Sequence, residues 1–167
     1  PEIVLCTDPK EVGSYQYRIV VGEDAAAYDR EGTLVLKPVN IAAGIGCRRG
    51  TGTELLEKGL DEILRANGRC MEQVKVIASI DLKKDEQALV HLSEKYQIPF
   101  LTYTAEELQR VREVSSGSEF VEKVTGIDNV CERAARLCCG DGEMIQEKAI
   151  RESMTAALVK CPVEIIF

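Results

Sequence analysis

From about residue 40 onward, short apolar runs typical of β-strands alternate with segments in which apolar residues recur at helical spacing. This alternation is typical of α/β proteins, where parallel strands are connected by helices that cover both faces of the sheet. We therefore predict an α/β fold, a three-layer sandwich around a mostly parallel sheet. Only a short turn separates the last two strand-like runs, which predicts a C-terminal antiparallel hairpin at one edge of the sheet.

The expected strands are near-continuous apolar runs, as in strands covered on both faces. They are expected at 41–46, 74–80, 99–103, 144–150 and 155–160. Helices are expected at 54–66, at 85–96, from 104 onward, in a short segment ending at residue 126, and from 128 or 129 to 139. The expected capping residues are Thr51 or Thr53, then Asp85, then Thr104 in a capping box with Glu107, then Asp128 or Asn129.

Residues 1–39 have a different pattern. They contain short apolar runs at 3–5, 18–21 and 33–36 but no helical segment to cover them. Two or three short strands without a covering layer do not build a core of their own. We interpret residues 1–39 as the end of a preceding (middle) domain plus a linker, and residues 40–167 as one α/β domain.

The charge balance excludes some partners. The chain has 21 Lys and Arg against 28 Asp and Glu, a net charge of −7. An acidic chain is a poor candidate for binding the phosphate backbone of nucleic acids. No apolar run approaches the ~18 residues of a membrane span, and the first residues lack the layout of a signal peptide. We expect a cytoplasmic protein with no nucleic-acid or membrane partner.

Seven cysteines occur at positions 6, 47, 70, 131, 138, 139 and 161, with no C-x-x-C pair and no nearby His. This spacing does not provide the ligands of a zinc site. We therefore expect no metal site and no disulfide framework. The thiols are expected to be reduced and to serve mostly as small core residues.

The stretch 44–53 reads Gly-Ile-Gly-Cys-Arg-Arg-Gly-Thr-Gly-Thr and follows the first strand of the predicted α/β domain. Glycines let the backbone approach a ligand, and arginines before a helix N-terminus suit carboxylates or phosphates. The stretch matches neither a dinucleotide fingerprint nor a P-loop. The alternative interpretation is a glycine-rich turn with two solvated arginines. In the binding interpretation, the candidate substrate-binding residues of this stretch are Gly46, Cys47, Arg48, Arg49, Gly50 and Thr51.

The second cluster, Asp-Leu-Lys-Lys-Asp-Glu at 81–86, also lies where a strand leads into a helix. Lys83, Lys84 and Asp85 are further substrate-binding candidates, and Asp81 and Glu86 are the candidates for a catalytic base. Alternatively these side chains are solvated, with Asp85 as a helix cap and Glu86 as a first-turn acid. A metal site has weak support from this spacing.

Four further side chains carry chemical groups of interest. Cys47 is either a nucleophile whose pKa is lowered by the neighbouring arginines or a buried small residue. His91 is expected on the surface of its helix. Basic groups at Lys148 and Arg151 are expected near the edge of the candidate site.

Several segments together resemble a known family. GIGCRRGT at 44–51 and IASIDLKKDEQALVHLSEKYQIPF at 77–100 are similar to the C-terminal domain of the cobalamin-biosynthesis protein CbiG, which is related to the free-standing CobE. The runs at 103–108, 118–137 and 144–159 resemble that family in the same order. The resemblance covers nearly all of residues 40–167.

The resemblance implies a role in the anaerobic route to cobalamin. Full-length CbiG is a cobalt-precorrin-5A hydrolase, which opens the ring-A δ-lactone of its substrate and releases acetaldehyde. The chain is then expected to be part of such a hydrolase and inactive alone. Its partners would be the corrinoid substrate and the N-terminal and middle domains of the same parent protein. The alternative is a non-catalytic corrinoid-binding or carrier module.

The resemblance implies no cofactor of the protein's own, since cobalt enters only as part of the corrinoid substrate. The family offers no agreed catalytic residues in this domain, so Asp81 and Glu86 rest on their residue types alone. Arg48 and Arg49 suit the acetate and propionate carboxylates around a corrinoid ring. Self-association into a homo-oligomer is left open by the sequence.

Overall fold

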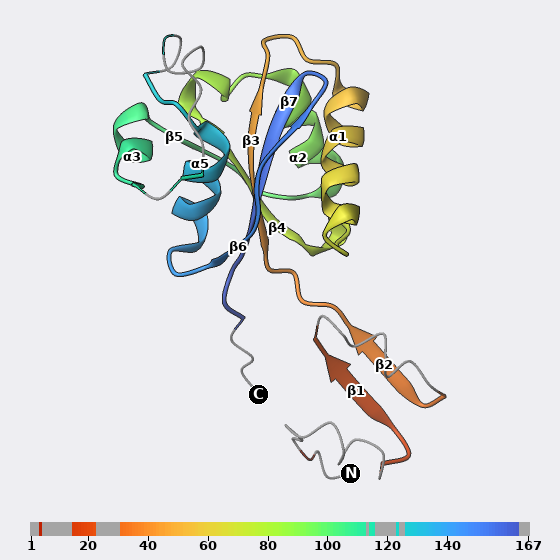
Figure 1. The fold of residues 1–167 in the computed structure, drawn as a ribbon. Coiled ribbons are helices and arrows are strands. Elements are labelled where there is room, and N and C mark those ends of the chain that lie inside the picture. The colour runs from red at the N-terminus through yellow and green to blue at the C-terminus, as the bar shows by residue number, and fades with distance from the viewer. Residues whose placement is uncertain are drawn as a thin grey trace. The chain divides into compact units, whose positions relative to one another are not determined.

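The computed structural model describes residues 4, 15–22, 31–112, 114–115, 123 and 126–163 (Figure 1). The chain divides into two compact units, Pro1–Pro38 and Val39–Phe167. In the first unit, strands β1 (Arg18–Val21) and β2 (Thr33–Leu36) form a parallel pair. The boundary falls one residue from the predicted one. That the first unit ends a preceding domain stays a prediction.

The second unit is built on a five-stranded sheet. Its strands are β3 (Ile41–Cys47), β4 (Val74–Ile80), β5 (Phe100–Tyr103), β6 (Glu143–Arg151) and β7 (Met154–Lys160). Their order across the sheet is β5-β4-β3-β7-β6. Strands β3, β4 and β5 are parallel, β7 runs antiparallel to β3, and β6 antiparallel to β7. The predicted α/β fold with an antiparallel hairpin at one edge is confirmed.

Helices cover both faces of the sheet (Figure 1). Helices α1 (Thr53–Ala66) and α2 (Gln87–Tyr96) bury their leucines against Ile41, Ala43 and Ile45. Helices α3 (Ala105–Gln109) and α5 (Val130–Cys139) lie on the other face, where Ala42 contributes to the core. Successive side chains of β3 thus point to opposite layers, as the two-residue period of a strand requires. Short 3₁₀ turns precede β4 (Met71–Gln73) and follow it (Asp81–Lys83).

Gly44 in the middle of β3 allows α5 to approach the sheet closely. A Cβ atom at this position would collide with the backbone carbonyl of Cys131 and lie 2.7 Å from the backbone nitrogen of Ala135. Both are main-chain atoms of α5, so they move only if the whole helix moves. A glycine is therefore required here by packing rather than by backbone conformation.

Two of the predicted helix caps are wrong. Helix α1 has Gly52 at its N-cap with no side-chain hydrogen bond, so neither Thr51 nor Thr53 caps it. Helix α2 begins later than predicted, with Glu86 at the N-cap position, so Asp85 is not the cap. Thr51 instead contacts the carbonyl of Ser153, and Glu86 accepts the backbone N–H of Gly50. Local propensity does not encode such contacts between loops.

The other two caps are confirmed. Thr104 and Glu107 form both hydrogen bonds of a capping box at the start of α3. The side chain of Asn129 accepts a hydrogen bond from the backbone nitrogen of Glu132 at the start of α5. The predicted short helix ending at Gly126 falls largely outside the described residues.

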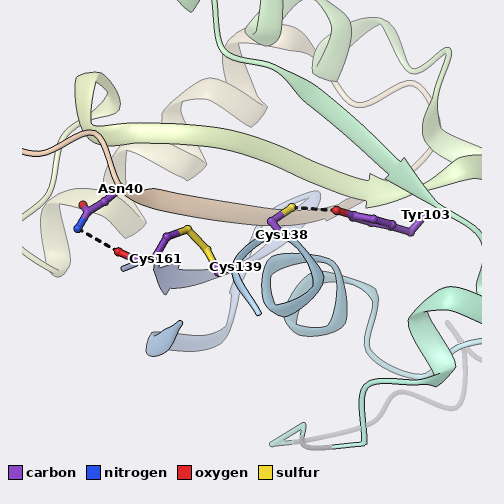
Figure 2. Close-up of a disulfide and its surroundings, with 5 residues drawn as sticks. All are labelled: Asn40, Tyr103, Cys138, Cys139 and Cys161. Atoms are coloured by element: carbon purple, nitrogen blue, oxygen red, sulfur yellow. Dashed lines mark hydrogen bonds between the residues drawn. A yellow bond between two sulfur atoms is a disulfide. The ribbon is translucent and has the colours of Figure 1, made fainter. Parts of the chain in front are cut away.

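The cysteines depart from the prediction at one pair. Cys139, the last residue of α5, forms a disulfide with Cys161, which follows β7 (Figure 2). Their Cα atoms lie 5.1 Å apart, within the usual range for a disulfide. The expectation of reduced thiols throughout is wrong at this pair, because the fold brings together two residues 22 positions apart. The other cysteines in the described part, Cys47, Cys70, Cys131 and Cys138, are not in disulfides.

The described residues contain neither a membrane-spanning helix nor a cluster of metal-ligating side chains. No helix there has the length and hydropathy needed to cross a membrane. Nor do three or more His, Cys, Asp or Glu side chains gather there in a way that would hold a metal ion.

Candidate functional site

The two sequence clusters meet at one end of the sheet. Strands β3 and β4 are parallel neighbours, so the loop after Cys47 and the 3₁₀ turn after Ile80 leave the sheet on the same side. The buried hydroxyl of Ser79 donates a hydrogen bond of 2.7 Å to the carbonyl oxygen of Ile45 and ties the ends of the two strands together. The carboxyl ends of parallel strands are where open α/β sheets bind ligands.

Glu86 connects the clusters directly. The backbone N–H of Gly50 donates to Glu86 Oε1 over 2.9 Å. Lys83 Nζ donates to Glu86 Oε2 over 3.3 Å. The side chain of Glu86 is only 9% exposed and that of Lys83 17%. The structure thus brings Gly50, Lys83 and Glu86 together, and both oxygens of the predicted base candidate Glu86 already accept hydrogen bonds.

The loop carrying the two arginines, residues 47–52, is anchored through its backbone. The N–H of Arg48 donates to the carbonyl of Ser153 over 3.1 Å, and the N–H of Thr51 donates to the carbonyl of Arg48 over 3.3 Å. The hydroxyl of Thr51 also donates to the Arg48 carbonyl, over 2.8 Å. Gly50 has a φ of +73°, which favours glycine in this turn. The turn between β6 and β7 thus supports the loop, a role the sequence did not reveal.

The guanidinium groups of this loop are available to a ligand. Arg48 and Arg49 are exposed, and neither side chain has a hydrogen bond or ion pair to another part of the chain that the structure describes. Helix α1 begins just after them without a side-chain cap, so its first N–H groups add to the positive potential. Two free guanidinium groups beside a helix N-terminus are an arrangement that attracts carboxylates.

The remaining candidates of the second cluster lie beside this loop. Asp81 is half-buried, and its backbone carbonyl accepts the N–H of Lys84 over 3.1 Å. Lys84 and Asp85 are exposed. Within the described ranges, the side chains of these three residues form no hydrogen bond or ion pair. Asp81 as a base, and Lys84 and Asp85 as ligand-binding residues, stay predictions.

Cys47 is a half-buried thiol rather than an activated nucleophile. Burial raises the pKa of Cys47 to about 11, although the charge of Lys83 acts in the opposite direction. The thiol is therefore protonated at neutral pH, and the interpretation in which nearby cations lower its pKa is wrong. Burial of the small side chain at the end of β3 explains its presence.

Three predicted residues have other roles or none at the site. His91 is exposed on α2, as predicted. The guanidinium of Arg151 pairs with Glu62 on α1, with Arg151 Nε 3.3 Å from the carboxylate. Lys148 contributes its backbone N–H to the buried carboxylate of Glu132, over 2.8 Å. The guanidinium of Arg151 is thus paired with α1, and that the ammonium group of Lys148 lies near the edge of the site stays a prediction.

Glu132 is the buried charge that sequence reasoning missed. Its side chain is buried in α5, and its carboxylate accepts hydrogen bonds from the N–H of Ser115 (2.8 Å), the hydroxyl of Ser115 (2.5 Å) and the N–H of Lys148. Burial alone would raise the pKa of Glu132, but these hydrogen bonds outweigh it and the pKa is lowered. In sequence Glu132 resembles an ordinary first-turn acid.

Comparisons with known proteins point to one family. The family model described as "Cobalamin synthesis G C-terminus" matches residues 41–159. The cobalt-precorrin-5A hydrolase of Salmonella typhimurium is 37% identical over 123 residues, which is 74% of this chain and 35% of that protein. The cobalt-precorrin-5A hydrolase of Priestia megaterium is 32% identical over 131 residues, 77% of this chain and 35% of that protein. The chain thus spans about a third of the length of these relatives.

A solved structure supports the same conclusion. The crystal structure of CobE, a protein from the cobalamin (vitamin B12) biosynthetic pathway, superimposes with a TM-score of 0.68 at 29% identity. The match covers 75% of this chain and 93% of CobE. With the family model matched over most of the sheet and its helices, the chain belongs to the CbiG C-terminal domain and CobE family of cobalamin biosynthesis.

Proposed function

We propose that this chain is the corrinoid-binding C-terminal part of a cobalt-precorrin-5A hydrolase. The complete enzyme would open the ring-A δ-lactone of its substrate and release acetaldehyde. In this proposal Arg48 and Arg49 bind carboxylates at the rim of the corrinoid, and Lys83, Lys84 and Asp85 border the same ligand. Cobalt enters as part of the substrate, and the chain supplies no cofactor of its own.

The observation that carries the proposal is the state of the two arginines. Their side chains are exposed and unpaired within the described part of the chain, while the backbone that bears them is held by Ser153, Thr51 and Glu86. A fixed backbone with free guanidinium groups suits bidentate capture of carboxylates. A chain with a net charge of −7 needs only this local positive potential to bind an acidic ring.

Lactone hydrolysis also requires a base that activates water and donors for the oxyanion that forms. We propose Asp81 for the base, because its carboxylate has no hydrogen bond in the described part of the chain. Glu86 is less suited, since Gly50 and Lys83 occupy both of its oxygens. The first N–H groups of α1 are the candidate oxyanion donors.

A second candidate function is a corrinoid-binding or carrier module without chemistry of its own. It is favoured by the length relations: the chain covers 93% of the CobE structure but only 35% of two cobalt-precorrin-5A hydrolases. In that case the catalytic residues of the hydrolases would lie in the part that this chain does not span. Both candidates use the same arginine loop.

Acetaldehyde release from cobalt-precorrin-5A separates the two candidates. The assay compares this chain with a full-length hydrolase of the family that carries it as its C-terminal domain. We expect turnover by the full-length protein, and a large loss when Asp81→Asn is introduced there. Full turnover by the Asp81→Asn protein, together with corrinoid binding by the chain, would favour the carrier module. If neither this chain nor the full-length protein binds a corrinoid, both candidate functions are contradicted.

A further inference from the structure

We propose that Glu86 is a positioning residue, which holds the arginine loop in its binding conformation before a ligand arrives. The inference rests on the proposed function, since it concerns the loop assigned there to corrinoid carboxylates. Glu86 would touch neither the substrate nor the reacting atoms. It would act through Gly50, the residue that follows the two arginines.

Glu86 connects two segments of the chain through its side chain. Its Oε1 accepts the backbone N–H of Gly50, which is 36 positions away in sequence. Its Oε2 accepts Lys83 Nζ from the neighbouring 3₁₀ turn. Gly50 is exposed, but the Glu86 side chain is only 9% exposed, so its carboxylate depends on these two donors in place of water.

The hydrogen bond to Glu86 is needed because side-chain packing does not restrict the backbone at Gly50. A Cβ atom added to this residue would meet no other atom within 4 Å. Glycine also has the greatest backbone freedom in the unliganded state. The hydrogen bond to Glu86 therefore restricts a segment that would otherwise lose entropy on binding, and preorganisation of this kind increases affinity.

Lys83 removes the electrostatic penalty of placing a carboxylate next to an anion site. An unpaired Glu86 would repel the carboxylates that Arg48 and Arg49 are proposed to bind. The ammonium group of Lys83, 3.3 Å from Glu86, offsets that charge. The thiol of Cys47, whose pKa burial raises to about 11, is protonated and adds no charge of its own. The loop is held without making the site negative.

Three substitutions separate the acceptor from the charge. Glu86→Gln keeps a carbonyl oxygen for the Gly50 N–H but loses the charge. Glu86→Asp keeps the charge but is one methylene shorter. Glu86→Ala loses both. We expect amide hydrogen exchange at Gly50 to accelerate at least tenfold in Glu86→Ala and Glu86→Asp, and to remain within threefold of wild type in Glu86→Gln.

The affinity of each variant is measured for cobyrinic acid, a corrin with free carboxylates. It is also measured for cobinamide, in which those carboxyl groups are amidated. We expect Glu86→Ala and Glu86→Asp to bind cobyrinic acid about tenfold more weakly, with the cobinamide affinity unchanged. Glu86→Gln should recover most of the loss. The control is Glu62→Ala, which removes a carboxylate that pairs with Arg151 and should change neither ligand's affinity.

The outcomes distinguish this inference from the proposed function. If Arg48→Ala combined with Arg49→Ala leaves the affinity for cobyrinic acid unchanged, the proposed function fails. If that double variant loses affinity while Glu86→Ala binds as wild type, only the positioning role of Glu86 is overturned. Unchanged hydrogen exchange at Gly50 in both Glu86→Ala and Glu86→Asp would also overturn it. Should Glu86→Ala not fold, Glu86→Asp and Glu86→Gln still give opposite expected results.

Discussion

The hydroxyl of Thr51 donates a hydrogen bond of 2.8 Å to the carbonyl of Arg48. The same hydroxyl lies 3.4 Å from the carbonyl of Ser153, which also accepts the N–H of Arg48. Thr51 is 8% exposed, so these polar groups are largely withdrawn from water. A residue with the sequence signature of a helix cap instead closes the loop that carries the two arginines.

Replacing Thr51 by Val tests this closure. Valine has nearly the same shape but leaves the Arg48 carbonyl without its side-chain donor, so we expect a loss of about 1–2 kcal/mol in the free energy of unfolding. Denaturant unfolding measures it. The matched control is Thr53→Val, at a hydroxyl with no hydrogen bond to any described residue, with an expected change below about 0.5 kcal/mol. Equal losses in the two variants would contradict the role of Thr51.

Gly44→Ala tests the contact between β3 and α5. The new methyl group would meet backbone atoms of Cys131 and Ala135, so α5 must shift away from the sheet. We expect a loss of about 3 kcal/mol in the free energy of unfolding, at the upper end of overpacking effects. Gly52→Ala is the comparison, because nothing lies within 4 Å of its added Cβ, and we expect about 1 kcal/mol at most. A neutral Gly44→Ala would contradict the close approach.

Glu132 predicts a specific acid dependence. Its folded pKa is lowered, so its contribution to stability is present above the unfolded pKa of about 4.3 and is lost as the pH falls through the folded pKa. In Glu132→Gln an amide N–H group faces the donors of Ser115 and Lys148. We therefore expect a loss of about 1–3 kcal/mol at pH 7.

The same variant should lose stability less steeply than wild type as the pH falls below about 5, since the titrating group is gone. Denaturant unfolding across this pH range measures both effects. Glu147→Gln, at an exposed carboxylate, should follow the wild-type curve. Parallel acid curves for Glu132→Gln and wild type would show that Glu132 does not titrate with folding.

The disulfide between Cys139 and Cys161 predicts sensitivity to reductants. It closes a segment of 22 positions, and cross-links of that size stabilise by about 3 kcal/mol in the chain-entropy model. We expect a thiol reductant to lower the melting temperature of the wild-type chain but not that of the Cys139→Ala, Cys161→Ala double variant. Intact mass gives the redox state. A wild-type melting temperature indifferent to reductant would contradict a stabilising role for the bond.

The sheet and its helices were predictable because each rests on a local pattern. The apolar run at 74–80 and the capping box of Thr104 and Glu107 carry their signal within a few residues. The close approach at Gly44, the disulfide of Cys139 and the buried carboxylate of Glu132 depend on partners far away in sequence. No local propensity encodes such contacts.

The sequence predicted which two segments form the candidate site, but not the hydrogen bonds between them. Glycines and arginines after β3 and a polar cluster after β4 are visible in the sequence, and the parallel pairing of the two strands places them together. From the sequence alone, Glu86 could be either a first-turn acid of its helix or a catalytic base. Only the three-dimensional arrangement of the two loops shows that Gly50 and Lys83 donate hydrogen bonds to the two oxygens of Glu86.

The most direct test of the account is the affinity of the chain for cobyrinic acid, with and without its two exposed arginines. Each charged hydrogen bond lost is expected to weaken binding by about 1.5–3 kcal/mol, so Arg48→Ala with Arg49→Ala should raise the Kd at least hundredfold. Lys58→Ala with Arg65→Ala removes two exposed cations on α1, outside the arginine loop, and should leave the Kd within threefold. A Kd for the Arg48, Arg49 double variant equal to that of wild type, in a protein that remains folded, would contradict carboxylate binding by this loop.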